Sequence, residues 1–372
     1  MKRVRVGLIF GGRSVEHEVS LVSARAVLNN LDGGRYDVVP IGVTREGRWL
    51  TSGDARGLLD SGLSRAIGTR AALTGDPSVG GLVPIEGNGV PTPLDIVFPL
   101  IHGTGGEDGT LQGLLELAGI PYVGSGVLGS SLGMDKGAMK VVLGAAGLAM
   151  TGHLALTRRR IETDADGIAR EVESTLGYPC FTKPANGGSS VGVNKVKRRE
   201  ELAAALAEAA SFDRRVVVEQ AVEGQEVECA VLGNDEPEAS VVGEIVPGHE
   251  FYDYSAKYLD DSSKLIIPAK INPAQAQEVR SMSLAAFKAL DLSGMARVDF
   301  FVRRADGKVL INEVNTLPGF TPISMYPRLW EASGVGFPDL IHRLIELGLQ
   351  RHEERMALRR DFAPGQRAPG AR

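Results

Sequence analysis

The sequence predicts an α/β fold whose C-terminal half has the mixed, α+β character of helices and antiparallel hairpins. First, residues 4–31 have the pattern of a strand, a glycine turn and a helix, which opens a β-α-β unit. Second, residues 95–118 repeat this order, and their apolar run is typical of a buried strand in a parallel sheet. Third, apolar runs at residues 296–302 and 309–314 flank an Asp-Gly turn, which indicates a β-hairpin.

The length of 372 residues suits two or three domains, each with its own core. We expect an N-terminal α/β domain with a parallel sheet, a central domain, a C-terminal domain and a disordered tail rich in Arg, Ala, Pro and Gly. The expected limits are 1–125, 126–214, 215–350 and 351–372.

The composition is that of a globular protein, with 43% hydrophobic and 23% charged residues. A net charge of −5 gives no basic footprint for nucleic acid. No apolar run approaches the roughly 20 residues of a membrane span, and the short apolar start indicates a first strand rather than a signal peptide. We therefore expect a cytoplasmic protein with no nucleic-acid or membrane partner. Cys180 and Cys229 lie in apolar runs and are expected to be buried free thiols.

The first glycine turn, Gly11-Gly12, follows a strand at residues 4–10 and precedes a helix that begins near residues 16–20 and ends near Leu31. It lacks the G-x-G-x-x-G spacing of a dinucleotide site. Glu16 at the helix start has two explanations: it complements the helix dipole, or it binds a substrate cation such as an ammonium.

The next elements are a strand at residues 37–43, an irregular Gly- and Pro-rich stretch at 47–93, and a strand at 95–100. A glycine-dense loop with His102 leaves this last strand, at the end where open α/β sheets bind ligands. His102 suits a turn residue and a functional residue equally well. A helix follows at residues 111–118.

A helix from residue 134 to 146 places Lys136 near its N-terminus, where the helix dipole disfavours a cation, so an anionic partner is expected. After a helix at residues 161–176, a strand carrying Lys183 runs into the Gly- and Ser-rich residues 184–193. This stretch is not a Walker loop, because no G-K-[ST] leads into a helix. It indicates a hairpin flap whose backbone N–H groups could cover phosphates.

Further along, a helix is expected at residues 200–210 and strands at 215–220 and 226–232. Glu219 and Glu226 suit hydrogen bonds to adenine and ribose, although charges on an edge strand are an equally simple explanation. The polar, tyrosine-rich residues 249–264 indicate a lid. We expect further helices at residues 273–291 and from Ser324 and Pro338 onwards.

The predicted hairpin carries three oxygen-bearing side chains, Asp299, Glu313 and Asn315. Glu313 and Asn315 share a strand face because they are two residues apart, and pairing can bring Asp299 alongside them. Such oxygen ligands suit Mg²⁺, and Arg297 adds a cation for phosphate or an oxyanion. A solvated hairpin face is the simpler alternative, which the apolar character of both strands disfavours.

Several of these stretches together resemble the D-alanine–D-alanine ligases of the ATP-grasp superfamily. The resemblance extends over about residues 4–345 in the family's order. The matching stretches are residues 11–20, 102–113, 133–140, 183–193, 219–233, 251–258 and 296–325.

The resemblance implies an N-terminal α/β domain followed by a two-subdomain ATP-grasp fold with ATP between the two subdomains. The implied nucleotide contacts are Lys136 and Lys183 with phosphates, Glu219 with adenine, Glu226 with ribose, Lys257 with the γ-phosphate, and the flap residues Gly187, Gly188, Ser190 and Val191 over the phosphates. The implied metal ligands are Asp299, Glu313 and Asn315, which would hold two Mg²⁺ or Mn²⁺ ions.

The resemblance also implies that two D-alanines are joined for peptidoglycan synthesis through an acyl phosphate. Glu16, linked to Ser189 and Tyr258, would bind the ammonium of the first D-alanine. Arg297 and the Gly319 N–H would form the oxyanion site, and Ser324 would hold the second carboxylate. The departures from the family pattern are small: Phe320 where the family often has methionine, and the extra tail.

Three alternatives remain at this stage. A dinucleotide dehydrogenase would explain only the first glycine turn, and a non-catalytic nucleotide-binding module would not require Arg297 or the three hairpin ligands. The third alternative is closer: a D-alanine–D-lactate ligase of the same family or another ATP-grasp carboxylate–amine ligase. The lid segment with Tyr258 favours an amino-acid acceptor over D-lactate. A homodimer is the family expectation.

Overall fold

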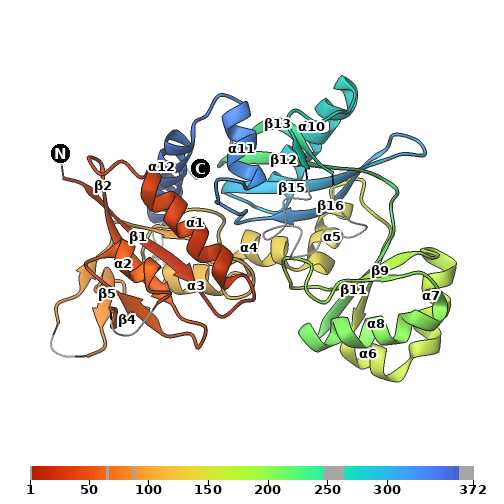
Figure 1. Cartoon of the computed structure of the whole chain (residues 1–372), viewed down its shortest axis with the longest axis horizontal. Coiled ribbons are helices and arrows are strands. Elements are labelled where there is room, and N and C mark those ends of the chain that lie inside the picture. The colour runs from red at the N-terminus through yellow and green to blue at the C-terminus, as the bar shows by residue number, and fades with distance from the viewer. Residues whose placement is uncertain (1, 64–66, 87–88, 247–263, 360–372) are drawn as a thin grey trace, which may run out of the picture.

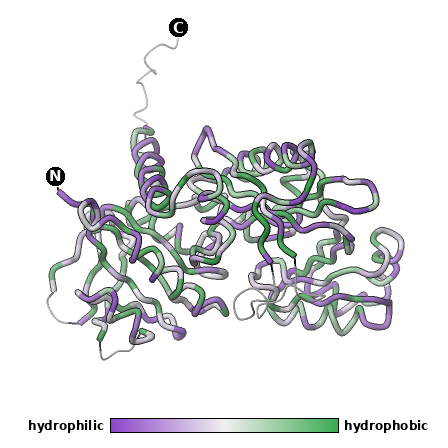
Figure 2. The backbone as a smooth tube through the Cα atoms, turned by 45° about the horizontal axis from the view of Figure 1, so that its top comes forward, coloured by the Kyte–Doolittle hydropathy of each residue, from purple (hydrophilic) through white to green (hydrophobic). Residues whose placement is uncertain are grey.

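The computed structural model describes residues 2–63, 67–86, 89–246 and 264–359. It has an N-terminal body, a C-terminal body built on a five-stranded sheet, and a smaller central body that lies below the C-terminal body in the view of Figure 1. Hydrophobic residues gather along the strands, whereas hydrophilic residues gather along the outer helices (Figure 2). No helix of the described residues is long and apolar enough to cross a membrane.

The N-terminal body confirms the predicted β-α-β opening. Strand β1 (Val4–Gly11) pairs in parallel with β2 (Tyr36–Val43) and with β7 (Ile96–Pro99). Helix α1 (His17–Asn30) follows the glycine turn, and α3 (Thr110–Leu117) follows the loop after β7. These strands are rich in Val and Ile because helices cover both sheet faces.

The N-terminal sheet is parallel at β2-β1-β7, and antiparallel strands extend it on the β2 side. The sheet has seven strands in the order β6-β5-β4-β3-β2-β1-β7, and four of them extend it in antiparallel fashion. They lie in the Gly- and Pro-rich stretch at residues 47–93, for which the sequence predicted no elements. Strands this short do not show the alternation that would have indicated them. The elements are β3 (Trp49–Thr51), α2 (Ala55–Asp60), β4 (Thr69–Leu73), β5 (Gly81–Pro84) and β6 (Thr92–Pro93).

Two consecutive helices connect the N-terminal body to the rest, α4 (Val127–Met134) and α5 (Lys136–Ala145). The sequence predicted α5 and not α4. Asp135 between them caps α5, since its side chain accepts a hydrogen bond from the Ala138 N–H at 2.9 Å. This cap fixes Lys136 at the first position of α5.

The central body is a four-stranded sheet in the order β10-β9-β11-β8, covered by helices. Its strands are β8 (His153–Thr157), β9 (Cys180–Pro184), β10 (Asn194–Val196) and β11 (Arg215–Gln220). Its helices are α6 (Arg158–Thr163), α7 (Ala165–Thr175) and α8 (Arg199–Phe212). The helix expected at residues 161–176 is thus divided, because Asp164 caps α7 by accepting from the Gly167 N–H. Strand β11 lies beyond the expected limit at residue 214, and the domain limits stay a proposal.

The C-terminal body is a five-stranded antiparallel sheet in the order β14-β13-β12-β15-β16. Its strands are β12 (Gly224–Gly233), β13 (Glu238–Val246), β14 (Lys264–Ile266), β15 (Gly294–Arg303) and β16 (Val309–Asn315). Its helices are α10 (Pro273–Ala289), α11 (Met325–Ala332) and α12 (Phe337–Met356). Cys180 in β9 and Cys229 in β12 are buried free thiols, as predicted.

The predicted start of the tail at residue 351 is too early, because α12 continues past this residue to Met356. Arg351 explains the continuation: its guanidinium lies 4.2 Å from the Tyr122 ring centre, and its Nη1 lies 3.7 Å from Glu116 Oε1. Helix α12 thereby packs against the N-terminal body, and its residues share one hydrophobic core with β1, α1 and β7. This shared core connects the C-terminal sheet to the N-terminal domain.

Candidate active site

A cavity of about 410 Å³ opens where the three bodies meet. Its walls come from the N-terminal turn and loops, the flap between β9 and β10, strand β12, and the β15–β16 hairpin with the loop after it. Every site residue predicted from the sequence that lies in the described part of the chain lines this cavity. Lys257 and Tyr258 lie outside the described residues.

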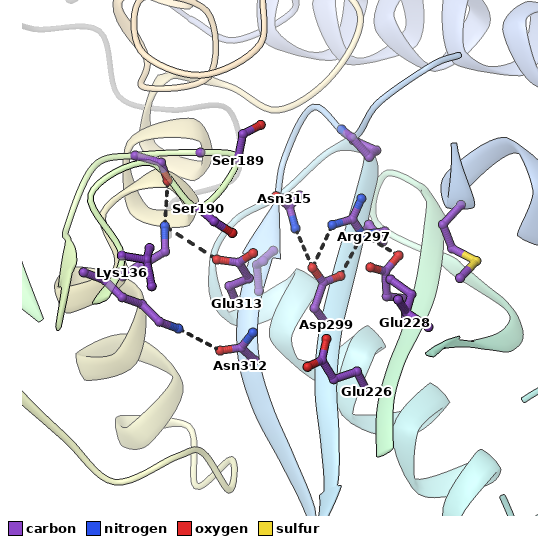
Figure 3. Close-up of a pocket in the computed structure, with 18 of the residues that line it drawn as sticks. Lys136, Ser189, Ser190, Glu226, Glu228, Arg297, Asp299, Asn312, Glu313 and Asn315 are labelled. Atoms are coloured by element: carbon purple, nitrogen blue, oxygen red, sulfur yellow. Dashed lines mark hydrogen bonds and ion pairs between the residues drawn. The ribbon is translucent and has the colours of Figure 1, made fainter. Parts of the chain in front are cut away.

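The β15–β16 hairpin has the register that brings the predicted ligands together. Arg297 pairs with Asn315, and Asp299 pairs with Glu313. The Arg297 guanidinium donates through Nε and Nη2 to the two Asp299 oxygens, both at 2.7 Å, and the Asn315 amide donates to Asp299 at 3.0 Å (Figure 3). All four side chains therefore lie on one face of the hairpin, as alternation requires.

A β-bulge in this hairpin adds a residue that the sequence analysis missed. The register shifts next to Asp299, so that Asn312 is the extra residue on β16. Asn312 and Glu313 consequently both line the cavity although they are adjacent. The Asn312 side-chain carbonyl accepts a hydrogen bond from Lys183 Nζ at 3.3 Å. Two consecutive polar residues after three apolar ones indicate an irregular strand, but they do not show where the extra residue is inserted.

Arg297 is held as a cation by carboxylates on both sides. Besides Asp299, Glu228 on β12 lies with Oε2 at 2.8 Å from the Arg297 Nε. Burial lowers the pKa of Arg297, but the charges of Asp299 and Glu228 outweigh burial and raise that pKa well above its usual value. The guanidinium is therefore a permanent, pre-oriented positive charge beside the cavity. Glu228 was not predicted, since one more carboxylate on a strand has no sequence signature.

The two predicted phosphate lysines enter the cavity from different bodies. Lys136 Nζ at the start of α5 donates to the Gly187 carbonyl at 2.7 Å and lies 3.5 Å from Glu313 Oε2. Glu313 is the anionic partner that was expected for Lys136 because Lys136 lies at a helix N-terminus. Lys183 Nζ on β9 donates to Glu219 Oε2 at 3.0 Å. Burial lowers the pKa of Lys183, but the charges of Glu219 and Glu313 outweigh burial and raise that pKa. Lys136 and Lys183 both line the cavity, so the two cations face the same space.

The glycine- and serine-rich flap reaches across the cavity to the N-terminal body. The Ser189 hydroxyl donates to Glu16 Oε1 at 2.5 Å, and both residues are buried. Ser189 and Ser190 have φ values of 51° and 60°, a conformation that L residues adopt only when the surroundings demand it. A Cβ on Gly188 would lie 2.5 Å from Glu16 Oε2, so only glycine permits this close approach. The flap thus closes one side of the cavity.

His102 is buried and hydrogen-bonded at both ring nitrogens. Nδ1 lies 3.1 Å from the Leu317 carbonyl and Nε2 lies 3.0 Å from the Ser23 hydroxyl. A carbonyl can only accept, so Nδ1 carries the proton and Nε2 accepts from Ser23. Burial lowers the pKa of His102, which keeps the ring neutral. His102 lines the cavity next to Glu16 and is more than a turn residue.

Glu107 is a buried acid in the same loop as His102, and it was not predicted from the sequence. Its Oε1 accepts from the Gly103 N–H at 2.7 Å and lies 3.8 Å from His102 Nδ1. Burial, with a smaller effect of the Glu16 charge, raises the pKa of Glu107 to about 8. The loop therefore holds a neutral carboxylic acid near pH 7. An acid inside a run of glycines has the appearance of a solvated loop residue, so no sequence signal marked it.

This proton should make stability depend on pH. A folded-state pKa of about 8, above the ordinary value of 4.5, means that stability is lost as pH rises through this window. Glu107→Gln keeps a neutral side chain and removes that loss. The unfolding temperature of the variant minus that of the wild type should increase from pH 5 to pH 9, as measured by calorimetry. Glu331→Gln, on an exposed surface of α11, is the control, and an equally flat difference for both variants would contradict a buried neutral acid.

The loop after β16 completes the cavity. Gly319 and Ser324 line it, and a Cβ on Gly319 would lie 2.9 Å from the Ser324 hydroxyl. The Ser324 hydroxyl in turn accepts from the Thr321 N–H at 3.0 Å and contacts the Thr321 hydroxyl at 2.7 Å. These hydrogen bonds fix the turn of the loop, and Gly319 lines the same cavity as Arg297.

The hairpin's donor set fits a hard divalent cation. No three His, Cys, Asp or Glu side chains converge as a metal site within residues 2–63, 67–86, 89–246 and 264–359. The hairpin instead offers two carboxylates and one amide, Asp299, Glu313 and Asn315. An incomplete shell of oxygen ligands suits Mg²⁺, which takes its remaining ligands from phosphates and water.

Comparison with known proteins agrees with this geometry. Residues 5–125 match the family model described as the D-ala D-ala ligase N-terminus, and residues 142–346 match the D-ala D-ala ligase C-terminus. The chain is 48% identical to a D-alanine–D-alanine ligase of Geobacillus thermodenitrificans over 363 residues, covering 97% of this chain and 99% of the relative. It is 49% identical to one of Ruminiclostridium cellulolyticum over 369 residues, covering 95% and 97%.

Solved structures give the same result. The D-alanine–D-alanine ligase of Coxiella burnetii superposes with a TM-score of 0.84 at 35% identity, covering 96% of this chain and 97% of that one. A D-Ala:D-Ser ligase of Enterococcus faecalis superposes with a TM-score of 0.84 at 38% identity, covering 93% and 100%. These matches establish the predicted ATP-grasp fold. The chain belongs to the D-alanine–D-alanine ligase family.

Proposed function

We propose that this protein joins two D-alanines with the energy of ATP, through an acyl phosphate of the first D-alanine, to supply a peptidoglycan precursor. The observation that supports this best is the single cavity that collects lysines, hairpin oxygens, Arg297 and the Glu16–Ser189 pair. Phosphoryl transfer and acyl transfer occur at the same carboxyl group, so a ligase needs both sets of groups around one space.

In the first step, a carboxylate oxygen of D-alanine attacks the γ-phosphorus of ATP. A new O–P bond forms and the bond to ADP breaks. Lys136 and Lys183 are positioned to balance charge on the phosphates, while Glu16 holds the ammonium of the first D-alanine. Glu219 and Glu226, which also line the cavity, are the proposed adenine and ribose contacts.

In the second step, the amine of the second D-alanine attacks the acyl carbon. Charge develops on the carbonyl oxygen, and we assign its stabilisation to Arg297 and the Gly319 N–H. The C–O bond to phosphate then breaks, and phosphate leaves with the proton that the amine gives up. Ser324 is the proposed contact for the second carboxylate. The Ser189 flap, together with the proposed lid residues Lys257 and Tyr258, would exclude water from the acyl phosphate.

Asp299, Glu313 and Asn315 are the proposed ligands of two Mg²⁺ or Mn²⁺ ions. Bound there, the ions would neutralise charge on the ATP phosphates. The hairpin register keeps the three side chains on one face beside Lys136. The proposed phosphate lysine and the proposed metal ligands therefore share one wall of the cavity. Cytoplasmic location and a homodimer are further proposals, which follow from the family and from the need for ATP.

The test is phosphate release and product analysis with ATP, Mg²⁺ and D-alanine. We expect D-alanyl-D-alanine with one phosphate released for each dipeptide, and no release with L-alanine. Parallel reactions contain equal D-alanine and D-lactate, or equal D-alanine and D-serine, because a solved relative is a D-Ala:D-Ser ligase. A predominant mixed product would reassign the acceptor, and absence of any D-alanine-dependent product would contradict the proposal.

A further inference from the structure

Lys140 is a fully buried cation with no role in the steps above. It lies on α5, four residues after Lys136, so both lysines share one helix face. Its side chain is 0% exposed. Nζ donates to the Thr151 hydroxyl at 2.9 Å and to the Asn312 main-chain carbonyl at 3.4 Å, and it lies 3.4 Å from Glu219 Oε1. A buried ammonium is costly unless it is paired, so its environment calls for an explanation.

The partner Glu219 stands between two lysines. Its Oε2 accepts from Lys183 at 3.0 Å and from the Thr151 hydroxyl at 3.4 Å. Its Oε1 faces Lys140 and accepts no hydrogen bond within the described part of the chain. Glu219 and Lys183 line the cavity, whereas Lys140 lies behind the wall that they form. Lys140 can therefore influence a ligand only through Glu219.

The charges of Lys183 and Lys140 keep Glu219 ionised. Burial raises the pKa of Glu219, but Lys183 and then Lys140 outweigh it and bring that pKa down to about 2. A buried, ionised carboxylate attracts any cation within reach. Without Lys140, the Lys183 ammonium would be the sole lysine balancing Glu219, and it would be drawn towards that carboxylate and away from the cavity.

We propose that Lys140 is a positioning residue for the nucleotide: it balances Glu219 from behind the cavity wall and so leaves the Lys183 ammonium available to ATP phosphates. The inference rests on the proposed function, because it takes Lys183 as a phosphate ligand and Glu219 as part of the nucleotide site. Lys140 touches neither substrate, and its replacement should change the affinity for the nucleotide but not the affinity for D-alanine.

The first test is Lys140→Met, which keeps chain length and removes the charge. Calorimetric titration with ADP and Mg²⁺ should show an affinity about tenfold weaker than in the wild type. The KM for ATP should rise in the same proportion, while the KM for D-alanine and kcat change far less. Leu143→Met, on the same helix and equally buried, is the matched control and should leave ADP affinity unchanged.

A double-mutant cycle distinguishes positioning from simple core damage. In a Glu219→Gln background there is no buried carboxylate to compete for Lys183, so adding Lys140→Met should weaken ADP binding less than about twofold. An equal loss in both backgrounds, or no loss in either, would overturn the proposal. If Lys140→Met does not unfold cooperatively, Lys140→Gln replaces it, since it removes the charge and keeps a donor for the Thr151 hydroxyl and the Asn312 carbonyl. A selective loss of ADP affinity in Lys140→Gln supports the proposal, and an unchanged affinity overturns it.

The proposed function is tested separately by the wild-type protein. If the wild type forms no dipeptide, the ligase assignment is wrong whatever the lysine variants do. If the wild type forms dipeptide and Lys140→Met binds ADP normally, only the role of Lys140 is wrong.

Discussion

Replacement of Arg297 by lysine should lower kcat by about 10²- to 10³-fold, the usual cost of removing one oxyanion donor. The guanidinium is fixed by a two-pronged pair with Asp299 and by Glu228, so its remaining N–H groups have a defined direction. Lysine keeps the charge but presents a single ammonium that cannot reproduce this fork. The loss should appear mainly in kcat, because the developing oxyanion exists only in the transition state.

Steady-state phosphate release with saturating ATP and D-alanine measures this effect. Arg303→Lys is the matched control, because Arg303 lies on the same strand and forms a similar two-pronged pair with Asp306 at the exposed end of the hairpin. The control should keep wild-type turnover. A wild-type kcat in Arg297→Lys, with the fold intact by circular dichroism, would remove Arg297 from the oxyanion site.

Replacement of Glu313 by glutamine should reduce activity about a hundredfold or more and weaken divalent-cation binding. The amide preserves the size of the side chain and removes the charge that faces both Asp299 and Lys136. Carboxylates bind Mg²⁺ and Mn²⁺ far better than amides do when phosphates supply the other ligands. The fold should persist, since Glu313 contributes no apolar packing.

Mn²⁺ binding in the presence of ADP, followed by electron paramagnetic resonance, gives a readout that does not depend on turnover. Asp306→Asn, at the opposite end of the same hairpin, is the control and should bind Mn²⁺ as the wild type does. Unchanged Mn²⁺ affinity in Glu313→Gln would show that the hairpin is not the metal site.

The sequence was sufficient to predict the hairpin because its signals are local. The Asp-Gly turn and the two apolar runs predict the hairpin, but the pairing of Asp299 with Glu313 depends on the bulge, because the register nearer the turn would pair Asp299 with Asn312. Asn312 escaped prediction because a bulge inserts one residue, and alternation carries no information about where a strand slips by one. The short strands between residues 49 and 93 escaped because two to five residues are too few to show a period.

Residues whose role depends on distant partners could not be predicted. Lys140 is a buried cation only because Glu219 folds against it from another body of the protein. Glu107 holds a proton because the loop around it excludes water and because the nearby Glu16 adds negative charge. The contact between Ser189 and Glu16 was expected from the resemblance alone, since nothing in either local stretch indicates that the flap reaches the N-terminal domain.

The central claim is that one cavity carries a carboxylate through an acyl phosphate to an amide. D-alanine labelled with ¹⁸O in both carboxyl oxygens tests it directly, because the bond between acyl carbon and bridging oxygen breaks in the second step. Mass spectrometry of the released phosphate should find one ¹⁸O atom for each dipeptide formed, and the ADP should be unlabelled. Dipeptide formation with unlabelled phosphate, or with the label in AMP, would contradict the account.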